Sequence, residues 1–192
     1  MFVMDHNILL TLMFVAYISP ITYVYYKYSI ADAARSISSI ITSKESLFTV
    51  ATFIPVFQTR HFIAASMFVM AVFTILYEYQ RCVALNIWWS LFAIVILLIG
   101  IFGVIYIPEH DWTHYIFAGA AFFAILGFMT AHTICRDTAG DIHDNLRILL
   151  YAQFLFMLVT IIGVVHDTPI FIFEALFLVN FAVFYLYLHS MH

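Results

Sequence analysis

The sequence predicts an all-α, polytopic integral membrane protein with six transmembrane helices, and three observations predict it. Hydrophobic residues make up 65% of the 192 residues and charged residues only 9%, whereas a soluble domain carries roughly a quarter charged residues. Apolar stretches long enough to cross a bilayer recur along the chain. Most connections between them are short, so consecutive helices are expected to be antiparallel neighbours in a single domain.

Six segments have the length and apolar character of a membrane span. They cover residues 7–26, 62–79, 83–107, 114–135, 148–165 and 169–189. A seven-helix alternative would need residues 36–57 to cross the bilayer as well, with Lys44 and Glu45 in the middle of that span. Charged side chains are costly at that depth, so six spans are favoured.

The long first connection predicts an interfacial segment over residues 28–57. Its first part, SIADAARSISSIITSK, places apolar residues on one helical face and polar residues on the other, which is typical of a helix lying in the membrane surface. Its second part, Leu47–Phe57, is apolar but reaches only about 16 Å at about 1.5 Å per residue, too short to span. We expect this part to be re-entrant, interfacial, or an early extension of the second helix kinked at Pro55.

The distribution of basic residues predicts that both termini are cytoplasmic. With six spans, the termini and the second and fourth connections share one side, and that side holds Arg81, Arg136 and Arg147. The short loops on the other side, PEHDWTH and HDTP, contain no Lys or Arg. The first connection opposes this signal, because it places the remaining basic residues on the other side: Lys27, Arg35, Lys44 and Arg60.

Ionisable side chains crowd the predicted non-cytoplasmic face. The stretch IPEHDWTHYIFAGAAFF, residues 107–123, carries several just before the fourth span, and Glu174 lies roughly 7 Å below the interface in the sixth. Histidine moves protons near neutral pH, and an acid inside a span is costly unless it has a role. The candidate acid–base site therefore consists of His114, His166 and Glu174. The candidate contacts to a lipid head group or protein partner are Arg60, His61, Asp111 and Asp167.

A structural role for the same residues is an open alternative. Acidic residues before a helix cap its N-terminus, and either Asp111 or Thr113 could be the N-cap of the fourth span. His110 and His114 have an i,i+4 spacing but lack the glutamate of the HExxH zinc motif, so no metal is expected. The histidines do not pair at matching depths on neighbouring helices as two haems would require, and no cofactor is expected.

Small and amide side chains inside the spans predict helix–helix contacts. We expect close helix approach along the fourth span, and Asn180 in the sixth span to need a partner on another helix. The small residues of the fourth span are Ala118, Gly119, Ala120, Ala124 and Gly127.

Two segments resemble helices of the Frag/DRAM/Sfk group of six-helix membrane proteins. HYIFAGAAFFAILGFMTAHTI resembles the group's fourth helix, and FEALFLVNFAVFYLYLH resembles its last helix. The resemblance implies cytoplasmic termini and a long first lumenal connection, and it marks His114, Gly119, Glu174 and Asn180. The group includes the factor that remodels the lipid of GPI anchors and others at lysosomal or plasma membranes.

Three functions stay open from the sequence. The first is binding or remodelling of membrane lipid at the non-cytoplasmic surface, and no nucleophile is evident, so catalysis is undecided. The second is a non-catalytic subunit of a larger membrane complex, respiratory or channel, with membrane proteins as partners. The third is an ion or proton pathway. A net charge of −4 offers no basic surface for nucleic acid. Secretory-pathway, endolysosomal or plasma membranes are favoured over the mitochondrial inner membrane.

Overall fold

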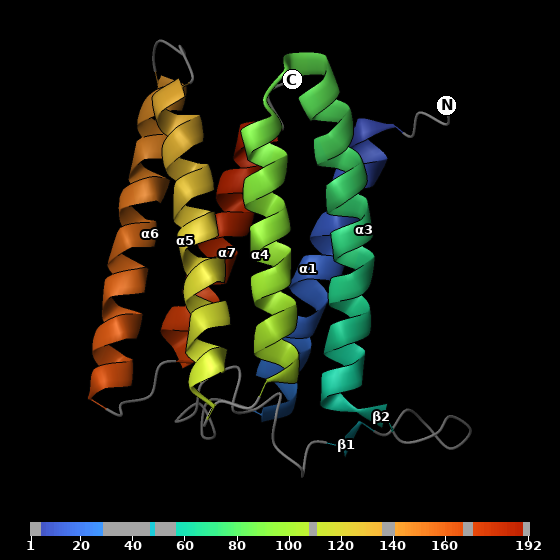
Figure 1. The fold of residues 1–192 in the computed structure, drawn as a ribbon, viewed down its shortest axis with the longest axis vertical. Helices are drawn as coiled ribbons and strands as arrows, with labels where there is room; N and C mark the ends of the chain where they lie inside the picture. Colours follow the sequence, from blue (N-terminus) through green and yellow to red (C-terminus); the bar gives the residue numbers. More distant parts are fainter. Residues whose placement is uncertain are drawn as a thin grey trace.

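The structure is a computed structural model that describes residues 5–28, 47–48, 57–107, 111–135, 141–166 and 171–189 (Figure 1). Five of its helices are long and apolar enough to cross a membrane: α3 (Thr59–Leu85), α4 (Trp88–Tyr106), α5 (Trp112–Cys135), α6 (Asp141–Val165) and α7 (Phe171–His189). A further helix, α1 (His6–Tyr28), has 23 residues, which reach about 35 Å and exceed the roughly 30 Å of a bilayer core. The predicted all-α membrane fold is confirmed.

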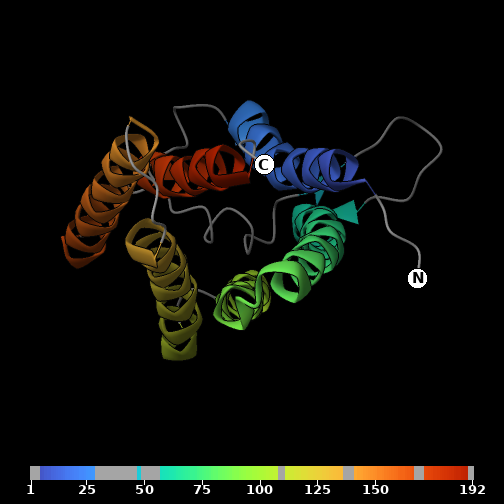
Figure 2. The same cartoon turned by 90° about the horizontal axis from the view of Figure 1, so that it is seen from above.

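The six helices form a ring when seen from above (Figure 2). Going round it, α1, α3, α4, α5, α6 and α7 each contact the next helix, and α7 contacts α1 to close the ring. Successive helices run in opposite directions (Figure 1), as predicted for those joined by short connections. The start of α1 and the end of α7 therefore lie at one end of the bundle, which we call the terminal end; the other is the opposite end.

The boundary between α3 and α4 differs from the predicted one. The prediction ended the second span at Tyr79 and placed Arg81 in a loop, but α3 continues to Leu85 and α4 begins at Trp88. Asn86 makes the turn with a φ of 55°, a left-handed conformation that asparagine tolerates better than most residues. A charged residue predicts a loop from sequence, but Arg81 has partners inside the ring, so the helix continues through it.

The first connection is described only at four residues. Strand β1 (Leu47–Phe48) pairs antiparallel with β2 (Phe57–Gln58), with Leu47 opposite Gln58. Of the three alternatives for residues 47–57, the early extension of the second helix is therefore wrong, because Phe57 and Gln58 are paired strand and α3 begins after them. The same pairing is incompatible with a single helix over residues 36–57. The predicted surface helix lies outside the described residues.

Close packing between α4 and α5 comes from different glycines than predicted. A Cβ added at Gly100 would lie 2.8 Å from the Phe117 carbonyl oxygen, and one at Gly103 would lie 2.2 Å from the Phe117 ring. The expected small residues Gly119 and Gly127 instead face open space. The glycines that allow close approach therefore belong to α4, and α5 supplies the side chains that fill the gap.

Candidate functional site

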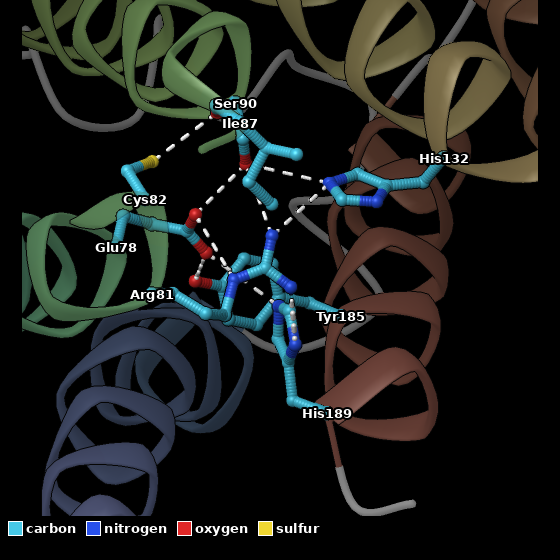
Figure 3. Close-up of polar contacts among 8 residues, drawn as sticks. All are labelled: Glu78, Arg81, Cys82, Ile87, Ser90, His132, Tyr185 and His189. Carbon is cyan, nitrogen blue, oxygen red and sulfur yellow. Dashed lines mark hydrogen bonds and ion pairs between the residues drawn. The ribbon is translucent and has the colours of Figure 1, made fainter. Parts of the chain in front are cut away.

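Buried polar side chains from four helices meet inside the ring at the terminal end (Figure 3). All of them are at most 7% exposed. Because these groups would be costly to bury unless they satisfied one another, their contacts decide what the site can do. We call this group the polar cluster; it consists of Glu78 and Arg81 of α3, Ser90 of α4, His132 of α5, and Tyr185 and His189 of α7.

The turn between α3 and α4 brings the first three members together. Glu78 and Arg81 are three residues apart, so they lie on the same face of α3. The left-handed Asn86 reverses the chain, and Ser90 then lies in the first turn of α4. The Cys82 thiol donates to the Ile87 carbonyl oxygen at 3.3 Å, which ties the end of α3 to the turn (Figure 3).

Glu78 is the centre of the polar cluster and is fully buried. Its Oε2 accepts a hydrogen bond from the Ser90 hydroxyl at 2.8 Å and lies 3.4 Å from Arg81 Nε. Its Oε1 accepts from the Tyr185 hydroxyl and lies 3.5 Å from His189 Nε2. Both carboxylate oxygens therefore have donors around them, as a buried carboxylate requires.

Arg81 fixes the protonation of the two histidines. Its Nη1 lies 3.0 Å from His189 Nδ1, and its Nη2 lies 3.3 Å from His132 Nε2. A guanidinium only donates, so both ring nitrogens must accept, and each histidine is neutral with its proton on its other nitrogen. The remaining charges are those of Glu78 and Arg81, so the polar cluster is neutral overall.

The Ser90 and His132 contact does not make a nucleophile and base. Ser90 Oγ lies 3.3 Å from His132 Nε2. However, the hydroxyl proton is directed to Glu78 at 2.8 Å, and the same histidine nitrogen accepts from Arg81. The geometry therefore favours a binding role over nucleophilic catalysis.

An apolar cleft lies inside the ring beside the polar cluster. It is partly open, and its space of about 460 Å³ includes the part that opens to the surroundings; it is lined by residues of α1, α3, α4 and α7. Tyr185 belongs to both features, because its ring lines the cleft and its hydroxyl donates to Glu78. Thr74, one helical turn before Glu78 on α3, also lines the cleft.

The sequence-predicted acid–base site lies at the opposite end. His114 is 3% exposed, and its Nδ1 donates to the Ile107 carbonyl oxygen of the α4 terminus at 2.8 Å. His166 follows the last turn of α6 and is exposed, and Glu174 is half-buried in the first turn of α7. Within the described ranges, no hydrogen bond or ion pair joins His114 to His166.

The remaining predicted contacts have mixed outcomes. Asp111 is the N-cap of α5, because its Oδ1 accepts from the Thr113 backbone amide at 3.0 Å and from the Thr113 hydroxyl at 2.8 Å. Arg60 and His61 lie in the first turn of α3, and their side chains are outside what the structure describes. Asp167 also lies outside the described residues. In the part of the chain that is described, no group of three or more His, Cys, Asp or Glu side chains could hold a metal ion.

The expected partner of Asn180 is found on α6. Its Nδ2 donates to the Leu149 carbonyl oxygen at 2.9 Å and to Gln153 Oε1. Gln153 in turn donates to the Phe177 carbonyl oxygen at 3.0 Å. These bonds link α6 to α7, and the predicted interhelical role of Asn180 is confirmed.

Sequence reasoning missed the polar cluster, although one signal for it was present. Glu78 and Arg81 stand at i,i+3 next to an apolar run, and an ion pair at that spacing can remain within a helix. Treating the pair as the end of a span removed it from the candidate site. Comparison of the chain with protein-family models, curated protein sequences and solved structures finds no match.

Proposed function

We propose that this protein binds a membrane lipid, with the apolar chain in the cleft and the polar end at Tyr185. The observation that carries the proposal is the junction of an apolar cleft with a buried polar cluster at a single side chain. A lipid has the same division into apolar and polar parts. The cleft lining is almost wholly apolar and supplies contacts to the chain, and the polar cluster marks the end at which the polar part would lie.

The composition of the cleft favours a lipid over an ion pathway. Only Tyr17, Thr74 and Tyr185 bring polar side chains to its lining, and the other ten lining residues are apolar. An ion or proton pathway needs polar side chains or water along its length, and such groups would be aligned through the bilayer. The charges of the polar cluster are gathered at the terminal end instead.

The proposed site is at the terminal end, not at the surface expected from the sequence. With the termini predicted to be cytoplasmic, the polar end of the lipid would lie in the cytoplasmic half of the bilayer. Two helices resemble those of the Frag/DRAM/Sfk group, and this resemblance agrees with a lipid ligand. From the same resemblance we propose that the chain is related to that group. Binding is the proposed activity, since Ser90 is held as a donor to Glu78.

The test is to purify the protein in a mild detergent and identify retained lipid by native mass spectrometry. Ala182 lines the cleft and is 6% exposed, so Ala182→Phe should fill the space and remove the lipid. Val183, the next residue of α7, is 45% exposed on the outer face, so Val183→Phe is the matched control and should retain it. Equal lipid retention by wild type and Ala182→Phe, with both folded by circular dichroism, would contradict the proposal.

A further inference from the structure

We infer that the polar cluster is a pH-sensitive switch, which keeps the terminal end of the helix ring closed while His132 and His189 are neutral and opens it when either histidine takes up a proton. The inference goes beyond lipid binding and does not depend on it. It follows from the position of one guanidinium, that of Arg81, between the two histidine rings (Figure 3).

Arg81 connects helices that are not neighbours in the ring. Its Nη1 donates to His189 Nδ1 of α7 at 3.0 Å, and its Nη2 donates to His132 Nε2 of α5 at 3.3 Å. The neighbours of α3 in the ring are α1 and α4. The bond to His132 therefore joins α3 to α5 across the terminal end, and the bond to His189 joins α3 to α7.

A proton on either accepting nitrogen is incompatible with these bonds. A guanidinium only donates and stays charged in proteins, so a protonated ring nitrogen would set one N–H group against another. It would also place two positive charges 3.0 Å or 3.3 Å apart, and like charges repel more strongly in a buried site than in water. A histidine that takes up this proton must therefore move away from Arg81.

Glu78 does not compensate for the added charge. Its Oε2 accepts from Ser90 at 2.8 Å and lies 3.4 Å from Arg81 Nε. Its Oε1 accepts from Tyr185 and lies 3.5 Å from His189 Nε2, which carries the proton of the neutral ring. The single negative charge is already balanced by Arg81, so a further proton leaves a net positive charge buried inside the ring.

Other titratable groups on the surrounding helices do not offset this charge. Two lie on α3 and are uncharged near neutral pH: Tyr77, whose ring centre is 5.1 Å from that of His189, and Cys82. The charged groups that the structure describes on α1 and α6 at this end are exposed: Asp5 just before α1, and Asp144 and Arg147 of α6, which pair with each other at 3.7 Å.

The switch is placed to respond to the aqueous phase at the terminal end. His189 is the last residue of α7, and His132 lies in the last turn of α5. Histidine is the side chain that ordinarily changes its charge between about pH 5 and about pH 8. Acidification on that side therefore separates α3 from α5 and α7 at this end.

The test measures the distance between α3 and α5 by double electron–electron resonance in nanodiscs. Spin labels at Leu85→Cys and Ile134→Cys occupy exposed positions near the ends of these helices, in a background with Cys82→Ser and Cys135→Ser. Between about pH 7.5 and about pH 5, the ratio of the longer to the shorter distance should rise about tenfold, as expected when one hydrogen bond to a charged group is lost. An unchanged distance distribution would overturn the inference.

Variants that keep the acceptors but cannot titrate assign the response to the histidines. In His132→Gln/His189→Asn, the amide oxygens can accept from Arg81 and take up no proton, so the shorter distance should dominate at both pH values. A pH response that persists in this double variant would assign the titration to another group, such as Glu78, and overturn the inference. If the double variant does not fold, His132→Gln alone is measured in the same way, because the labelled helices are those that His132 connects.

Two controls separate opening at the terminal end from general unfolding. His166 is exposed at the opposite end, so His166→Gln should leave the pH response unchanged, and loss of the response would overturn the inference. A second label pair, Tyr106→Cys and Val165→Cys, occupies exposed positions at the opposite end, and its distance should not change. A change in both label pairs would show acid unfolding of the whole ring and would also overturn the inference. The measurement needs no bound lipid, so its failure leaves the proposed function to be judged by lipid retention.

Discussion

The two ends of the helix ring contain similar ionisable residues but use them differently. At the opposite end, Asp111 caps a helix at the surface, His114 bonds to the terminus of the neighbouring helix, and His166 is exposed. At the terminal end, Glu78 and Arg81 lie inside the ring with partners from three other helices. Residues close together in the sequence thus serve local structure, whereas the interacting cluster is assembled from distant parts of the chain.

The largest expected effect is at the terminal end. Arg81→Leu leaves Glu78 buried without its cation, and removing one partner of a buried ion pair costs about 3–5 kcal/mol. Thermal unfolding in detergent should show this loss. The double variant Glu78→Gln/Arg81→Leu should recover part of it, because the uncompensated carboxylate is gone.

The matched control for Arg81 is Arg147. Its Nη1 lies 3.7 Å from Asp144, and its side chain is 52% exposed. An exposed ion pair contributes about 0–1 kcal/mol, so Arg147→Leu should barely change the unfolding temperature. Similar losses of stability from Arg81→Leu and Arg147→Leu would show that the buried ion pair of the polar cluster contributes no more than an exposed one.

The next largest effect tests the close packing of α4 on α5. A Cβ at Gly100 would lie 2.8 Å from the Phe117 carbonyl oxygen and the Ala121 amide nitrogen. Because these are backbone atoms, the clash can be relieved only by shifting α5 away from α4. Gly100→Ala should therefore be about 1–3 kcal/mol less stable than Gly119→Ala in the same thermal assay. Both variants gain the higher helix propensity of alanine. Because Gly119 faces open space, the difference in stability between them measures the clash at Gly100. Equal stability of the two would mean that α4 and α5 separate easily.

A smaller effect is expected at the α5 N-cap. Asp111→Ala removes the acceptor for the Thr113 amide and should reduce stability by about 1 kcal/mol, within a range of about 0.5–2 kcal/mol. Asp111→Asn keeps a capping oxygen and should lose much less. Equal stability of the two variants would contradict the capping role, and a larger effect of Asp111→Ala on lipid retention than on stability would show a role beyond capping.

The smallest effect is expected at His166. Its side chain is exposed after the last turn of α6, and surface substitutions usually change stability by less than about 0.5 kcal/mol. His166→Ala should therefore match wild type in unfolding temperature and in lipid retained by mass spectrometry. A clear loss of lipid would indicate that the lipid binds at the opposite end.

Much of the helical layout follows from the sequence because membrane helices depend on local properties. Length and apolarity are sufficient to predict α4 to α7, and the expected need of Asn180 for a partner is met by α6. The errors occur where polar residues continue a helix. The end of α3 carries Arg81, and the start of α6 extends back to Asp141. A hydropathy criterion ends the predicted span at such residues. The helix itself continues, because its backbone hydrogen bonds are kept and buried partners satisfy the polar side chains.

The sequence by itself determined that this chain crosses a membrane, since so few charged residues cannot cover a soluble globule. It also determined that short connections make successive helices antiparallel neighbours. Only the tertiary structure decided which titratable groups meet. Glu78, His132 and Tyr185 come from three helices, and they converge because the ring closes α7 onto α1 and α4 onto α5. The direction of each hydrogen bond in the polar cluster depends on that convergence.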